Sequence, residues 1–363
     1  MISRIKLIPA ISSLLVILSL SALLPACQKE EKKLTNREIY LYQGPDRDQK
    51  LVAQGKKEGA LNIYTSMNPK DAELLIGAFE KKHGIKVTLW RALPEKVAQR
   101  VLIETKAGRY DVDVIEVNGP DMETLYREKI IEEFYSPAFK DIPPEIFPSH
   151  RHYVPDRVNL FVLAYNTRLT KAEELPNSYE DLLKPKWRGK LGLRSGDVDW
   201  FASVVTAMGE EKGLEYFKKL AAMKPLMRPD HTILPEMVAS GEVPIALNAY
   251  LHAVERVKKK GGTVDWKPLQ PMFGRPGVVG LSGNAPHPYA ALLFVDFLLS
   301  KEGQDIIRER GRVPSSMVVD SPVSNVKYGL IDAAITLDTW DKWSKLWSDL
   351  FLGGQTLKKE EEK

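Results

Sequence analysis

Polar and aromatic side chains suited to holding a small molecule follow several short apolar segments of the chain. The segment at 60–64 runs into Thr65 and Ser66, and the segment at 190–194 runs into Ser195. If these segments are strands of an open α/β sheet, their carboxyl ends and the amides of the following helix N-termini form the edge at which such sheets bind ligands. This rule selects ten candidate ligand-binding residues: Thr65, Ser66, Trp90, Arg91, Asn118, Arg194, Ser195, Trp200, Asn248 and Tyr250.

These candidates share one kind of chemistry. They supply hydroxyl groups, two guanidinium groups and large aromatic rings. An arginine fork matches the geometry of a carboxylate or a phosphate, and an indole supplies apolar area, so the set suits an anionic or zwitterionic molecule with a flat part. Other roles stay open: salt bridges for the two arginines, core packing for the two tryptophans, and helix capping for Thr65 and Ser66.

The sequence contains no clear metal or catalytic constellation. His150 and His152 lie in a proline-rich stretch, without a third ligand at metal spacing. His231 precedes a predicted helix and could reach the same ligand-binding edge. A Gly-x-Ser-x-Gly elbow, an HExxH helix, a Walker loop and a CxxC pair are all missing from the sequence. We therefore predict neither an enzyme nor a resident cofactor.

The N-terminal residues are typical of an export signal. Arg4 and Lys6 precede an apolar run at 7–24, and this run ends in Leu-Pro-Ala-Cys, whose last residue is Cys27. A small residue directly before a cysteine suits cleavage by a lipoprotein signal peptidase, which would leave Cys27 lipidated at the mature N-terminus. The alternatives are an uncut membrane anchor or ordinary secretion. The prediction is an exported protein, lipid-anchored to a membrane and facing the periplasm or the cell exterior.

Length and charge limit the remaining possibilities. Removal of residues 1–26 from the 363-residue chain leaves 337 residues, more than one core usually serves. Loss of Arg4 and Lys6 with the signal lowers the formal net charge from +4 to +2. So small an excess, without a basic stripe, argues against a nucleic-acid partner. Cys27 is the only cysteine, so no internal disulfide can form, and we expect a monomer.

Predicted strands and helices alternate along the chain. Strands at 60–64, 85–90 and 113–117 alternate with two helices, which is typical of a parallel, doubly wound sheet. The alternation restarts after a continuously apolar strand at 158–165. We therefore predict an α/β fold with two doubly wound lobes joined by a hinge. The predicted divisions are a signal peptide at 1–26, a tether at 27–45, a first lobe at 46–160 and 284–352, a second lobe at 161–283, and a flexible tail at 353–363.

Three tryptophans mark the C-terminal part of the chain. Trp340, Trp343 and Trp347 are spaced three and four residues apart, which places them on one face of a helix. Tryptophans at such spacing belong to a core more often than to a ligand cage. This helix is expected to pack on the body of the protein.

Four stretches resemble one known family. The residues at 61–92, 162–193, 239–250 and 286–316 are similar to the periplasmic ferric-ion-binding and related extracellular solute-binding proteins. The resemblance covers nearly all of 60–350. It implies the type II fold of periplasmic binding proteins, capture of a solute by hinge closure, and delivery to the permease of an ABC-type importer.

The resemblance leaves the solute open. Members of the family carry ferric iron, other metals, thiamine, phosphonates, sugar phosphates or polyamines, and the iron carriers use a tyrosine pair, a histidine and a glutamate. Of those ligands only Tyr250 has a match, since Thr65-Ser66-Met67 and Asn118 occupy the other positions. Ferric iron favours several anionic oxygen donors. A ferric-iron carrier therefore stays an alternative, as does a sensor that binds a solute and signals without transport.

Overall fold

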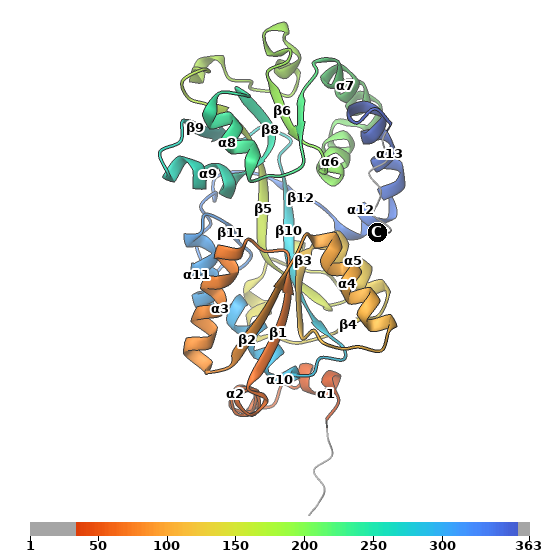
Figure 1. Ribbon diagram of the computed structural model, residues 1–363, viewed down its shortest axis with the longest axis vertical. Coiled ribbons are helices and arrows are strands. Elements are labelled where there is room, and N and C mark those ends of the chain that lie inside the picture. The colour runs from red at the N-terminus through yellow and green to blue at the C-terminus, as the bar shows by residue number, and fades with distance from the viewer. Residues whose placement is uncertain (1–33, 355–363) are drawn as a thin grey trace, which may run out of the picture. The chain divides into compact units, whose positions relative to one another are not determined.

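The computed structural model describes residues 34–354 and contains one mixed sheet with helices on its faces (Figure 1). Its strands follow the order β2-β1-β3-β10-β5-β8-β6-β7, with four short strands at the sides. The strands are β1 (Ala60–Thr65), β2 (Lys86–Arg91), β3 (Val114–Asn118), β4 (Ile131–Glu132), β5 (Tyr153–Asn166), β6 (Leu191–Arg194), β7 (Leu226–Arg228), β8 (Ile245–Tyr250), β9 (Val264–Lys267), β10 (Phe273–Ser282), β11 (Val313–Pro314) and β12 (Gly329–Leu330). The helices are α1 (Asn36–Tyr40), α2 (Arg47–Glu58), α3 (Pro69–His83), α4 (Pro94–Lys106), α5 (Gly119–Arg127), α6 (Val198–Met208), α7 (Glu210–Ala222), α8 (Ile233–Ser240), α9 (Leu251–Lys259), α10 (Pro288–Leu299), α11 (Lys301–Glu309), α12 (Ala333–Asp338) and α13 (Trp340–Phe351).

The strands β1, β2 and β3 and the helices on them are called the first lobe below. β1 pairs in parallel with both β2 and β3. Because successive side chains of a strand point to opposite faces, Ile63 packs in a core with α3 and α10, whereas Tyr64 packs in a core with α4. Helices thus cover both faces, as the doubly wound prediction requires.

The strands β6, β7 and β8 and their helices are called the second lobe. β6 pairs in parallel with β7 and β8. One of its cores contains Phe201 of α6 and Phe217 of α7, and the other contains Leu234 of α8 and Val254 of α9. The second lobe therefore repeats the layered arrangement of the first.

Two long strands, β5 with 14 residues and β10 with 10, connect the lobes. β10 runs antiparallel to β3 and to the first half of β5, where Gly274 is paired with Leu160. From Phe161 onward β5 pairs instead with β8 of the second lobe. The predicted apolar strand at 158–165 is confirmed as part of β5. Side chains on this strand pair lie where the two lobes meet.

Local signals explain the helix that follows the first strand. Asn68 caps α3 by accepting a hydrogen bond from the Lys70 amide at 3.1 Å, and Pro69 is the first helical residue. Gly84 ends the helix with a φ of 71°, a left-handed conformation that favours glycine. One of the two helices predicted between the strands at 60–64, 85–90 and 113–117 is confirmed, and residues next to it in the sequence set both of its ends.

The prediction of a tether at 27–45 is wrong for the residues that the structure describes. α1 lies within this range, and Ile39 and Tyr40 are buried. The Tyr40 hydroxyl donates a hydrogen bond to the Ser282 carbonyl oxygen at 3.0 Å. Residues 1–33, with the signal peptide and Cys27, and residues 355–363 lie outside the described part of the chain. Between 34 and 354, no helix is long and apolar enough to cross a membrane.

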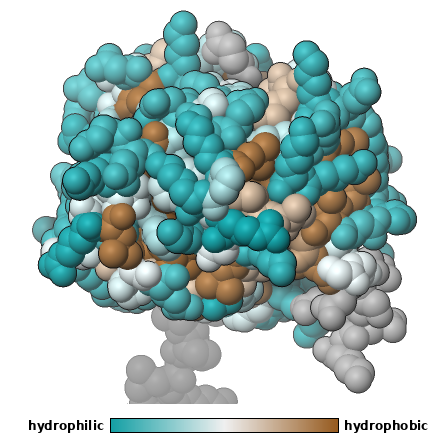
Figure 2. Space-filling view, turned by 90° about the horizontal axis from the view of Figure 1, so that it is seen from above, coloured by the Kyte–Doolittle hydropathy of each residue, from teal (hydrophilic) through white to brown (hydrophobic). Residues whose placement is uncertain are grey.

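The face of the protein seen in Figure 2 is mostly hydrophilic, and its hydrophobic side chains form small separate patches. Folded proteins normally expose scattered apolar residues of this kind. This face is therefore suited to contact with water.

Candidate functional site

The first-lobe candidates lie at the carboxyl ends of β1, β2 and β3, as predicted. Thr65 is 2% exposed; its hydroxyl donates to a Glu116 carboxylate oxygen and accepts a hydrogen bond from the Met67 amide at 2.8 Å. The Ser66 amide donates to the Glu116 carbonyl oxygen at 2.9 Å. The Thr65 side chain therefore holds the loop that follows β1. Ser66 and Asn118 are half-buried.

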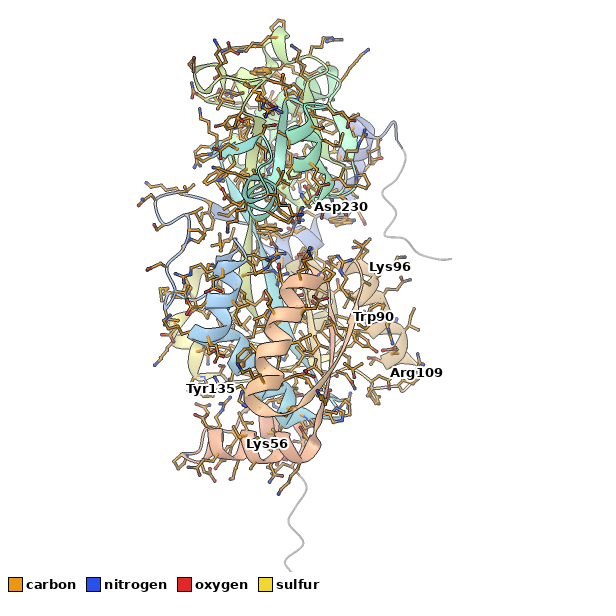
Figure 3. All side chains as sticks on the ribbon, turned by 60° about the vertical axis from the view of Figure 1, so that its left-hand side comes forward. Lys56, Trp90, Lys96, Arg109, Tyr135 and Asp230 are labelled. Carbon is orange, nitrogen blue, oxygen red and sulfur yellow. The ribbon has the colours of Figure 1, made fainter. Side chains whose placement is uncertain are left out.

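Trp90 and Arg91 differ in what surrounds them. The Trp90 ring lies 5.1 Å from the Tyr64 ring, centroid to centroid, and the Arg100 guanidinium lies 4.3 Å from the Trp90 ring centroid. In Figure 3, Trp90 lies on the first lobe, beside α4. Arg91 is exposed, and among the described residues its side chain makes one hydrogen bond, from Nε to the Met67 carbonyl oxygen at 3.3 Å. Arg91 therefore keeps donors for a ligand, whereas Trp90 is part of the packing.

The second-lobe candidates lie in or beside the segment at 194–199, which joins β6 to the first turn of α6 and is called the loop at 194–199 below. The Asn248 side chain accepts from the Arg194 amide at 2.9 Å and donates to Asp197 at 2.8 Å. The Ser195 amide donates to the Arg228 carbonyl oxygen at 2.8 Å. Gly196 leaves room for Arg194, because a Cβ there would lie 2.6 Å from an Arg194 nitrogen. This loop is held from β7 and β8 at once.

Trp200 belongs to the core rather than to a ligand surface. It is 1% exposed and packs 6.3 Å from Phe161 and 5.8 Å from Phe217, measured between ring centroids. The core alternative for this residue is thus the one that the packing supports. Because Trp200 has almost no exposed area, it can affect ligand binding only by shaping the loop at 194–199.

The centre of the site is an arginine that the sequence did not identify. Arg275 of β10 is 5% exposed, and its Nε donates to Asp199 at 2.6 Å. One terminal nitrogen donates to Asp197 at 3.0 Å, and the other donates to the Tyr250 hydroxyl oxygen. The guanidinium also lies 4.9 Å from the Phe161 ring centroid. Arg275 therefore ties the connecting strand β10 to α6 and β8 of the second lobe.

His231 covers the same cluster. Its ring stacks on Tyr250 at a centroid distance of 3.6 Å, and its Nε2 lies 3.1 Å from an Asp197 carboxylate oxygen. Its Nδ1 is buried and has no hydrogen-bond partner within the described part of the chain. The sequence-based possibility that His231 reaches the candidate site agrees with this position.

Burial and close charges set the protonation of the cluster. Burial acts to raise the pKa of Asp197, but His231, Arg194 and Arg275 outweigh it and hold that pKa well below its usual range. Burial raises the pKa of Tyr250 to about 12, although the neighbouring Arg275 acts to lower it. Burial also lowers the pKa of His231. At neutral pH the cluster thus has an ionised carboxylate, a neutral phenol and a neutral imidazole.

A second buried cluster of charges includes Glu116, whose carboxylate accepts hydrogen bonds from the loop that follows β1. Arg157 of β5 contacts Glu116 at 2.6 Å and Asp156 at 2.7 Å. Burial raises the pKa of Asp156 to about 6, with Glu116 adding to the rise and Arg157 opposing it. Gly277 makes room for the arginine, because a Cβ there would lie 2.7 Å from the Arg157 guanidinium carbon. Both connecting strands thus carry a buried arginine where the lobes meet.

The described residues form no ready-made metal cage. No group of three or more histidine, cysteine, aspartate or glutamate side chains between 34 and 354 is placed to hold a metal ion. The oxygen of Tyr250, the one residue that matches the iron carriers, already accepts a hydrogen bond from Arg275. The donor set is therefore richer in guanidinium groups than in free anionic oxygens.

A family model described as bacterial extracellular solute-binding protein matches residues 112–345. The chain belongs to this family. The Fe(3+)-binding periplasmic protein of Serratia marcescens is 25% identical over 257 residues, which cover 68% of this chain and 75% of the relative. A periplasmic protein of Salmonella paratyphi A, named for binding 2-aminoethylphosphonate, is 25% identical over 284 residues, which cover 75% of this chain and 81% of the relative. The solved structure of the periplasmic binding protein AfuA from Actinobacillus pleuropneumoniae, with fructose-6-phosphate bound, matches with a TM-score of 0.71 and 21% identity, covering 81% of this chain and 98% of that one.

These comparisons confirm three predictions for this solute-binding protein. The family is the expected one, the fold is that of type II periplasmic binding proteins, and the function is that of the solute-binding component of an ABC-type importer. Its relatives are binding proteins of the periplasm. The ten predicted site residues and the two lobe boundaries stay predictions.

Proposed function

We propose that this solute-binding protein captures a small anionic or zwitterionic organic solute between the strand-end loops of its two lobes and delivers it to an importer permease. The observation that carries the proposal is the Arg275 cluster, in which a buried guanidinium on a connecting strand meets two aspartates and a phenol. Hinge closure would bring Arg91 and Ser66 of the first lobe towards this cluster. The solute would then be held by groups from both lobes.

The charge balance of the cluster favours a solute that carries both signs. Arg194 and Arg275 are matched by Asp197 and Asp199. A purely anionic group that took hydrogen bonds from Arg275 would leave a buried carboxylate without its partner, which is costly. A solute with its own ammonium group could replace both halves of an ion pair. This argument supports a zwitterion over a simple anion.

The names of two relatives agree with an organic anion as the solute. One relative is named for 2-aminoethylphosphonate, and one structural neighbour was solved with fructose-6-phosphate. Both molecules present a phosphorus oxyanion, which an arginine fork recognises. The candidate site contains arginine side chains with this forked arrangement of donors.

Ferric iron is the second candidate solute, because the Serratia relative is an Fe(3+)-binding protein. The local chemistry opposes it. A phenolate ligand requires deprotonation of Tyr250, whose pKa burial raises to about 12, and the Arg275 donor would have to move away. Iron binding would thus demand rearrangement of the whole cluster.

Isothermal titration with four probes tests the proposal. We expect 2-aminoethylphosphonate to bind more tightly than ethylphosphonate and fructose-6-phosphate, which both lack the ammonium group, and than ferric citrate. Arg91→Gln should weaken the best probe about tenfold or more, the cost of one hydrogen bond to a charged group. Arg109→Gln is the matched control, since Arg109 is also an exposed first-lobe arginine but follows α4, far from the strand ends (Figure 3).

Two outcomes would overturn this assignment. Binding of ferric citrate alone, with a visible charge-transfer colour lost in Tyr250→Phe, would make the protein an iron carrier. Equal losses in Arg91→Gln and Arg109→Gln would show that the strand-end edge is not the binding surface.

We also propose that Cys27 carries a lipid and that the mature protein works as a monomer held beside its permease. The Leu-Pro-Ala-Cys sequence at 24–27 supports the anchor. A lipid anchor raises the local concentration of the binding protein near a membrane permease. Repeated delivery over a short distance then follows.

A further inference from the structure

We infer that the C-terminal helix α13 is part of the binding site without contacting the solute, and that Trp347 is a positioning residue for the loop at 194–199. The inference rests on the proposed function, because it assumes that this loop takes part in binding. The positioning of the loop by Trp347 can be tested without any ligand.

The main observation is one hydrogen bond. The indole nitrogen of Trp347 donates to the Ser195 carbonyl oxygen at 2.6 Å, across 152 positions of the sequence. Trp347 is fully buried, so water does not compete for this donor. A buried indole needs a partner for its single donor, and Ser195 supplies it.

Packing fixes the indole before it reaches the loop. The Trp347 ring lies 5.3 Å from Phe201 of α6 and 4.5 Å from Phe351, measured between ring centroids. Trp343, one turn earlier, lies 5.8 Å from the same Phe201. Because the helix face is anchored by these contacts, the donor is held at a set place relative to Ser195.

The Trp347 contact adds a support from α13 to those that the loop has from the second-lobe strands. Further supports come from β8 and β7. Asn248 accepts from the Arg194 amide and donates to the Arg194 carbonyl oxygen at 3.3 Å, and the Arg228 carbonyl oxygen accepts from the Ser195 amide. Trp347 acts on a carbonyl group, from α13. The loop contains Asp197 and Asp199, the partners of Arg275.

The same C-terminal segment also contacts the first lobe. β12 pairs with β10 at Gly274, the residue before Arg275. α12 packs on α5, where Gly119 is close to Ala333 and Arg127 forms an ion pair with Asp338. α13 then packs on α6 and α7 (Figure 1). Because this C-terminal segment is attached to both lobes and to the loop at 194–199, it couples the position of that loop to movement about the hinge.

The test compares Trp347→Phe with Trp343→Phe. Both variants replace an indole on the same helix face with a smaller ring against Phe201, but only Trp347 donates a hydrogen bond to the loop. Hydrogen–deuterium exchange of the ligand-free protein should show the Arg194 and Ser195 amides exchanging about three- to tenfold faster in Trp347→Phe, the effect of one net hydrogen bond. Trp343→Phe should leave these amides unchanged while lowering the melting temperature to a similar degree.

Titration with 2-aminoethylphosphonate and fructose-6-phosphate provides the second readout. We expect Trp347→Phe to weaken whichever probe the parent protein binds by about three- to tenfold, mostly through faster dissociation. Unchanged exchange at Arg194 and Ser195, or equal changes in both variants, would overturn the positioning role. Faster exchange in Trp347→Phe together with no binding of any probe by the parent protein would instead leave the positioning role standing and refute the proposed ligand class.

Discussion

Replacement of Arg275 by methionine tests whether this arginine neutralises buried charge. Asp197 would keep its contacts with Arg194 at 3.0 Å, His231 at 3.1 Å and Asn248 at 2.8 Å. The carboxylate that loses its charged partner is therefore that of Asp199, which is 4% exposed. Removing one partner of a buried ion pair costs about 3–5 kcal/mol. We expect the free energy of unfolding at pH 7 to fall by about that amount, a large part of the total stability of a typical domain.

A second substitution identifies the cause of that loss. Asp199→Asn in the Arg275→Met background removes the unpaired charge and should recover about 2 kcal/mol or more, a coupling expected only for residues in direct contact. Arg194→Met is the control, because Asp197 keeps three other partners and this arginine is 25% exposed. We expect Arg194→Met to lower the free energy of unfolding by only about 1 kcal/mol.

The pH dependence of the Arg275→Met variant gives an independent check. An unpaired buried carboxylate takes up a proton more readily than an exposed one, so the folded variant binds more protons than its unfolded chain between pH 7 and pH 5. The variant should gain stability relative to the parent protein as the pH falls over this range. Urea unfolding monitored by tryptophan fluorescence measures both quantities. A loss below about 1 kcal/mol at pH 7, or no recovery with Asp199→Asn, would refute the role given to Arg275.

Three further predictions concern the same cluster and the anchor. Tyr250→Phe removes the oxygen that accepts from Arg275 but keeps the aromatic stack on His231, so urea unfolding should show a loss of about 1.5–3 kcal/mol; no loss would mean that this contact contributes nothing. Burial lowers the pKa of His231 from its usual 6.5, so the unfolded chain takes up a proton first as the pH falls, and stability is lost from about pH 6.5 down to the folded-state pKa. His231→Gln should therefore flatten the decline of the urea midpoint between pH 7 and pH 5.5, and an unchanged slope would contradict this assignment. Cys27→Ser should move the protein from the membrane fraction to the aqueous phase in detergent partitioning, whereas continued membrane association would rule out the lipid anchor.

Short-range signals predicted many of the elements that position the site. The Asn68-Pro69 start and the Gly84 end of α3 could be read from the sequence because caps involve residues only a few positions apart. The tether prediction failed although a comparable signal was present. Thr35 and Glu38 form a capping box at the start of α1, with reciprocal hydrogen bonds between side chain and backbone. The spacing of Thr35 and Glu38 is therefore a sequence signal for a helix at this place.

Arg275 could not be placed from local patterns because its partners lie far away in the sequence. Asp199 and Tyr250 are 76 and 25 positions from it. The three meet because β5 pairs with both β10 and β8, and because α6 packs beside β10. One signal is nevertheless visible in the sequence: Asp197 and Asp199 are two closely spaced aspartates shortly after the apolar segment at 190–194.

The candidate residues can be separated by what their polar atoms already bind. The side chains of Thr65, Asn248 and Tyr250 all make hydrogen bonds within the protein, and each of these bonds orients a loop or another side chain. Arg91 is exposed and makes a single long side-chain hydrogen bond among the described residues. A solute can compete for Arg91 at little cost, whereas every contact taken from a buried group must be replaced. Under the proposed function, solute selection would depend on matching the buried charges of the Arg275 cluster, while Arg91 would add affinity that a range of anions could share.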